Sequence, residues 1–107
     1  MNAGEIYNDA SSKLINLATE LLIKITENIK TNRINVTEYD VDLTNVIVWG
    51  EDEILAKGFD IETIYFDGKN IEIYNEEEEY RNFFELPMNS MVFVVNGIED
   101  ILKEIKN

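Results

Sequence analysis

Carboxylates are the side chains of this sequence that could do chemistry, and they are densest in two short runs. These runs are Glu51-Asp52-Glu53 and Glu76-Glu77-Glu78-Glu79. Paired carboxylates can act as general acid and base, and clustered carboxylates can bind a cation. The chain has no Cys and no His, which excludes thiolate nucleophiles, Cys-ligated metals and imidazole general bases. Any catalysis would therefore depend on carboxylates, hydroxyls, Lys, Arg or Tyr.

Neither acidic run has the spacing of a metal site or of a catalytic site. A calcium loop needs oxygen ligands at alternating positions, a Gly bend and a terminal Glu, and the four glutamates do not match this pattern. Neighbouring side chains of an extended chain point in opposite directions, so consecutive glutamates do not converge on one point. With 22 acidic residues among 107, some carboxylate pair always lies at a suitable distance for hydrolysis, so such a pair identifies nothing. We expect solvated turns, no cofactor, no metal, no catalytic residue and no enzymatic activity.

The acidic residues are concentrated in the middle of the chain. Residues 1–35 are neutral overall and residues 86–107 carry a net charge of −1, whereas residues 36–85 carry −12. A field of this sign repels nucleic acid and anionic lipid and attracts a basic protein surface. We therefore expect a basic protein partner, with no direct nucleic-acid binding and no membrane association. An inhibitor that mimics nucleic acid is the sharpest form of this hypothesis.

The elements that must position these side chains are organised around a predicted hairpin at residues 63–74. A tight loop at Gly68-Lys69 suits Gly, which adopts positive φ without steric cost. This register pairs Phe66 with Ile71 and Tyr65 with Glu72, so that matched side chains share a face. The apolar face consists of Ile64, Phe66, Ile71 and Ile73, and the polar face consists of Thr63, Tyr65, Glu72 and Tyr74.

Two helices are predicted to cover the apolar face of the hairpin. Residues 5–31 place their apolar side chains in one arc about half the circumference wide. Residues 88–105 repeat apolar side chains at spacings of three and four, and this pattern outweighs the turn signal of Asn96-Gly97. A helix around Gly97 forms at a cost of ~1 kcal/mol relative to Ala. The wide apolar arcs also predict a homodimer through the helices.

The other segments are predicted to be short strands and turns. Residues 32–35 are expected to break the first helix, and residues 36–49 fit one bent strand or two, with alternation over 37–43. A loop at Glu51-Asp52 predicts a second hairpin that pairs Trp49 with Ile54 and Val48 with Leu55. The alternative is a short helix over 51–57 that ends at Gly58. Residues 80–86 are expected to form a last strand, and Trp49 and Phe66 are expected to pack in the core or against cross-strand neighbours.

The sequence therefore predicts a single α+β domain over residues 1–107, with a long N-terminal helix, an antiparallel meander of three to five strands and a C-terminal helix, both helices lying on one sheet face. It has no secretory signal and no apolar run of membrane-spanning length, so we expect a cytoplasmic protein. By analogy of size and charge alone, we expect an accessory protein of a phage or mobile element. The leading hypothesis is a protein-binding module. The alternatives are a homo-oligomerising structural domain and a carboxylate-based hydrolase or cation-binding protein. The candidate binding residues are Glu51, Asp52, Glu53, Tyr65, Glu72, Tyr74, Glu76, Glu77, Glu78 and Glu79.

Overall fold

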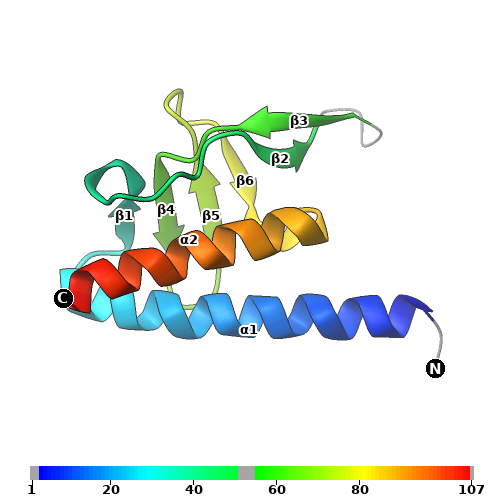
Figure 1. The fold of residues 1–107 in the computed structure, drawn as a ribbon, viewed down its shortest axis with the longest axis horizontal. Coiled ribbons are helices and arrows are strands. Elements are labelled where there is room, and N and C mark those ends of the chain that lie inside the picture. The colour runs from blue at the N-terminus through cyan, green and yellow to red at the C-terminus, as the bar shows by residue number, and fades with distance from the viewer. Residues whose placement is uncertain (1–2, 51–54, 107) are drawn as a thin grey trace.

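The part of the chain that the structure describes folds as an α+β domain with a helix near each end and six short strands between them. The computed structural model describes the backbone of residues 3–50 and 55–106, and the side chains of residues 10–50 and 55–106. The helices are α1 (Ala3–Ile29) and α2 (Met88–Lys106), and they lie side by side (Figure 1). The strands are β1 (Arg33–Asn35), β2 (Val46–Trp49), β3 (Ala56–Phe59), β4 (Thr63–Phe66), β5 (Ile71–Tyr74) and β6 (Tyr80–Asn82). Two 3-10 turns follow β1 and β6, namely η1 (Val36–Glu38) and η2 (Phe83–Glu85).

Both predicted helices are present. Helix α1 ends where Lys30 takes a φ of 61° and donates its backbone N–H to the Thr26 carbonyl at 2.9 Å, a left-handed cap. Helix α2 starts after Pro87, whose carbonyl accepts the first N–H groups of the helix. Neither described helix combines the length and apolarity that crossing a membrane requires.

Helix α2 continues through Gly97 because of a close neighbour. Gly97 is buried, and a methyl group built on it would lie 2.6 Å from Leu43 Cδ2. Glycine at this position lets the segment before β2 approach the helix backbone. The Asn96-Gly97 pair, which resembles a turn in the sequence, is therefore explained by the close packing of Leu43 against the helix and not by a reversal of the chain.

The central hairpin has the predicted register. Strands β4 and β5 pair Phe66 with Ile71 and Tyr65 with Glu72, and Gly68 has a φ of 98°. The sheet order is β1-β4-β5-β6, all antiparallel. The apolar hairpin face is buried, and both helices contribute buried side chains to the same hydrophobic cluster, so they share one core with this face. Placement of both helices on one sheet face stays a prediction, which this shared core supports.

The second hairpin forms a separate two-stranded sheet, and its register differs from the prediction. Val48 lies opposite Lys57 rather than Leu55, and Trp49 lies opposite Ala56, whereas its predicted partner Ile54 is outside the described residues. The shift of two residues keeps every side chain on its face and places Phe59 opposite Val46, so that two buried side chains meet. The alternative short helix is wrong at residues 56 and 57, which belong to β3.

Three further segments differ from the prediction. Residues 32–35 interrupt the helix as predicted, but residues 33–35 also form strand β1, because Ile34 pairs with Ile64 in the core. Residues 36–38 form η1 and residues 39–45 are irregular, so the predicted strand is present only from Val46, although Leu43 is buried as the alternation implies. A hydrogen bond from the backbone to a distant side chain holds this segment, since the Asp40 N–H donates to the Glu104 carboxylate at 2.9 Å. The last predicted strand is limited to β6, and residues 83–85 turn as η2.

Candidate functional site

The four consecutive glutamates form the tip of the β5–β6 turn. Asn75 organises this turn, because its side-chain oxygen accepts the backbone N–H groups of Glu77 and Glu79, each at 3.0 Å. The Glu78 N–H donates to the Asn75 carbonyl at 3.1 Å, and Glu78 has a φ of 62°. This pattern is a type I turn followed by a left-handed residue, a common hairpin loop. All four glutamate side chains, Glu76 to Glu79, are exposed, as a solvated turn requires.

The other predicted acidic run, Glu51, Asp52 and Glu53, lies outside the described residues. The remaining predicted site residues, Tyr65, Glu72 and Tyr74, come together on the polar face of the central hairpin. Tyr65 lies opposite Glu72, and the Tyr74 hydroxyl donates to Glu72 Oε1 at 2.9 Å. This hydrogen bond raises the pKa of Tyr74 above its usual value, because it favours the protonated phenol.

Two residues that the prediction did not include complete the polar face. The Arg33 guanidinium lies 5.5 Å from the centre of the Tyr74 ring, and the Tyr80 ring centre lies 5.8 Å from the same ring. Arg33 reaches this face because β1 pairs with β4, with Arg33 opposite Tyr65. The sequence did not predict the contact between Arg33 and Tyr74, since residues 32–35 have the composition of a loop that ends a helix. The face is therefore an aromatic and charged platform rather than a purely acidic one.

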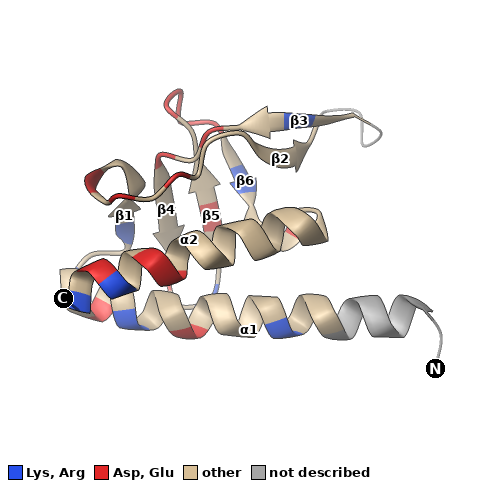
Figure 2. Ribbon diagram, in the orientation of Figure 1, with Lys and Arg blue, Asp and Glu red and all other residues tan. Residues whose placement is uncertain are grey.

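Acidic residues lie along the loops at the end of the sheet that is remote from the helices (Figure 2). Among these loops, the β5–β6 turn and the base of the β2–β3 hairpin enclose a shallow hollow of about 300 Å³. It is lined by Asn45, Gly58, Asp60, Asn75, Glu76 and Glu77. Asp60 is held in place because its Oδ1 accepts the Asn45 N–H at 2.6 Å. Within residues 10–50 and 55–106, no group of three or more acidic side chains is arranged to hold a metal ion. We define the acidic rim by Asp60, Glu76 and Glu77.

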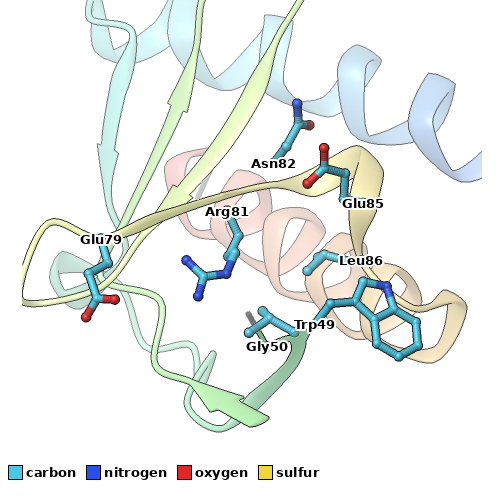
Figure 3. Close-up of a pocket in the computed structure, with 8 residues that line it drawn as sticks. Trp49, Gly50, Glu79, Arg81, Asn82, Glu85 and Leu86 are labelled. Atoms are coloured by element: carbon cyan, nitrogen blue, oxygen red, sulfur yellow. The ribbon is translucent and has the colours of Figure 1, made fainter. Parts of the chain in front are cut away.

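A larger groove of about 910 Å³ lies between β2 and the edge strand β6 (Figure 3). Its lining is Val48, Trp49, Gly50, Glu79, Arg81, Asn82, Glu85 and Leu86. Trp49 is 44% exposed and therefore lies outside the core, so of the two kinds of packing predicted for it only cross-strand packing, opposite Ala56, remains. In β2 the buried side chains are Val46 and Val48, which places Ile47 and Trp49 on the opposite, exposed face. A continuous run of four apolar residues shows no alternation, so the sequence did not indicate which two side chains would be exposed.

Arg81 forms the floor of the groove. It is opposite the buried Ile73 and therefore points to the core side of β6. Its guanidinium lies 5.6 Å from the centre of the Phe59 ring, and its Nη1 donates to the Tyr80 carbonyl at 2.9 Å. The sequence did not reveal this groove, because strands β2 and β6 are more than thirty positions apart in the chain.

Comparisons with known proteins leave the interpretation to this geometry. No protein-family model, no curated protein and no solved structure matches the chain.

Proposed function

We propose that this protein is a non-enzymatic binding module of the cytoplasm that presents its acidic rim to a basic partner protein. The observation that supports this proposal most directly is the convergence of Asp60 with Glu76 and Glu77 around one hollow. These carboxylates come from two loops, and the nearest two, Asp60 and Glu76, are sixteen positions apart in the chain. Among the residues that the structure describes, none of the side chains that line this hollow is basic, so the hollow presents only acidic and neutral groups to a partner.

The distribution of charge gives the rim a long-range role. The helical ends of the chain are nearly neutral, whereas residues 36–85 carry −12. A one-sided negative field steers a basic partner to the loops and raises the association rate at low salt. An inhibitor that occupies a nucleic-acid-binding groove would use the same field, because its carboxylates would take the places of phosphates.

The test is affinity capture from the native host at low and high salt. In a rim variant, Asp60→Asn, Glu76→Gln and Glu77→Gln together remove three charges and keep the side-chain shapes. A control variant removes three exposed helix charges by Glu20→Gln, Glu27→Gln and Asp100→Asn. We expect the wild type and the control to capture a basic protein at 50 mM but not at 500 mM salt, and the rim variant to lose it. Equal capture by the rim variant and the control, or no salt-sensitive capture at all, would refute the proposal.

Homo-oligomerisation is the second candidate, and exposed apolar side chains on both helices favour it. Leu17 and Ile23 of α1 and Val92 and Phe93 of α2 are each at least 40% exposed. Sedimentation velocity at micromolar concentrations tests this candidate, and a monomer throughout the range would exclude it.

A carboxylate-based hydrolase or a cation-binding protein stays an untested prediction. A general acid of a hydrolase needs a carboxyl group with a raised pKa. Asp42 and Asp67 instead have a lowered pKa, because hydrogen bonds from Thr44 and from the backbone of Asn70 stabilise their charged forms. Neither therefore supports this alternative.

A further inference from the structure

The groove between β2 and β6 borders an open edge of the four-stranded sheet. Strand β6 is at the end of the order β1-β4-β5-β6. In an antiparallel pair, opposed residues alternate between those that exchange backbone hydrogen bonds and those that do not. The Asn75 N–H donates to the Glu79 carbonyl, which makes the pair Ile73–Arg81 a bonded one as well. The backbone groups of Tyr80 and Asn82 therefore point away from β5, toward the open edge.

The hydrogen bonds of Arg81 agree with this orientation. Its guanidinium reaches the Tyr80 carbonyl from the groove side, so this carbonyl is accessible there. A carbonyl oxygen has two lone pairs, so it can accept a second hydrogen bond from another strand. An extended chain laid in the groove could pair with Tyr80 and with the Asn82 N–H, the mode known as β-strand addition.

The side chains around the groove specify the chemistry of such a strand. Trp49 offers an exposed aromatic wall, which suits an apolar side chain at the centre of the strand. Arg81 on the floor repels a central Lys or Arg. Glu79 and Glu85 lie at opposite ends of the β6–η2 stretch (Figure 3), and both are exposed carboxylates that attract cations. The complementary sequence has basic residues at both ends and an apolar residue between them.

We propose that this groove binds an extended peptide segment of a partner, with the pattern basic–apolar–basic, as an added strand on β6. The inference rests on the proposed function, since it assigns to the basic partner a docking segment and a place on this chain. The acidic rim attracts the partner, and the groove recognises the sequence of its segment.

The test uses a set of synthetic heptapeptides with Lys or Arg at the second and sixth positions and a varied apolar residue at the fourth. Trp49 is the only Trp of the chain, so its fluorescence reports on the groove directly. We expect the best peptide to shift this emission to the blue and to slow hydrogen exchange at the Tyr80 and Asn82 amides. A scrambled peptide and a peptide methylated at alternate backbone nitrogens each bind at least tenfold more weakly if strand pairing is correct.

Two charge variants separate the groove from the rim. Glu79→Gln with Glu85→Gln weakens the peptide about three- to tenfold, since two exposed ion pairs are lost. Glu76→Gln with Glu77→Gln removes the same charge from the rim, and we expect a change of less than twofold for the peptide. All four side chains are exposed, so neither variant endangers folding.

The outcomes distinguish this inference from the proposed function. If no peptide of the set changes the Trp49 emission, or if the scrambled peptide binds as well, the groove is not a strand-addition site. If the host's basic protein is still captured in a salt-sensitive way in that case, the acidic rim remains the binding surface. If neither the peptides nor any basic protein bind, both proposals are wrong.

Discussion

The substitution Gly97→Ala is a sharp test of the packing between α2 and the segment before β2. In an ordinary helix the change stabilises the protein by ~1 kcal/mol, because Ala has the higher helix propensity. Here the new methyl group would lie 2.6 Å from Leu43 Cδ2 and 3.0 Å from Leu43 Cγ. Leu43 is 2% exposed and belongs to the buried hydrophobic cluster, so a shift of its side chain would press on other core side chains. Overpacking of a core costs about 1–3 kcal/mol, so we expect a net destabilisation of about 1 kcal/mol.

Urea denaturation measures this change, with Asn96→Ala as the matched control. Asn96 is exposed on the same helix, so its replacement gains propensity without a clash and stabilises by about 0.5 kcal/mol. Leu43→Ala alone costs about 2–5 kcal/mol. In that background Gly97→Ala should become stabilising, since its methyl group enters vacated space. The reasoning is refuted if Gly97→Ala stabilises the wild type as much as Asn96→Ala does.

Three further predictions concern the loops and the polar face. Glu78→Gly should stabilise the protein by up to about 1 kcal/mol, because Glu78 has a φ of 62°, which Gly adopts without steric cost. Glu77→Gly should destabilise the protein. Thermal melts compare the two variants, and a higher stability of Glu77→Gly than of Glu78→Gly would contradict the turn assignment. The lowered pKa of Asp67 arises from backbone N–H groups that donate to its carboxylate, so its stabilising effect is present above the unfolded pKa of ~3.9 and is lost as pH falls through the lower folded pKa. The stability difference between wild type and Asp67→Ala should therefore narrow between pH 6 and pH 2 in denaturant titrations, and a constant difference would argue against this role. Glu72→Ala should lower the pKa of Tyr74, since the phenol loses its carboxylate acceptor, and an NMR titration of the ring that shows no change would contradict the hydrogen bond.

Sequence patterns predicted the elements that depend on neighbours along the chain. The β4–β5 register follows from matched side chains, because a loop at Asp67-Gly68 would shift the pairing by two residues and place Phe66 opposite Lys69. The β2–β3 register was wrong by two residues, since a shift of two keeps both faces intact and only the burial of Phe59 against Val46 selects between them. The pattern of apolar and polar residues along each strand does not show which of these two registers forms.

Features that depend on distant residues could not be predicted. The irregular path of residues 39–45 depends on Glu104 and Gly97, both more than fifty positions away. The polar face was predicted for Tyr65, Glu72 and Tyr74, which share a hairpin, but not for Arg33, which arrives through β1. The groove was missed altogether, because strands β2 and β6 meet only in the folded protein.

The positions of the two arginines have a consequence for aggregation. Arg33 and Arg81 are the only arginines of the chain, and they lie in β1 and β6, the two outer strands of the four-stranded sheet. Open strand edges invite pairing between copies and the growth of fibrils, and a charged side chain on an edge opposes this. When like edges of two copies approach in register, their guanidinium groups are brought together and repel each other. Each outer strand therefore disfavours pairing with the same strand of another copy, whereas a strand of different sequence meets no such repulsion.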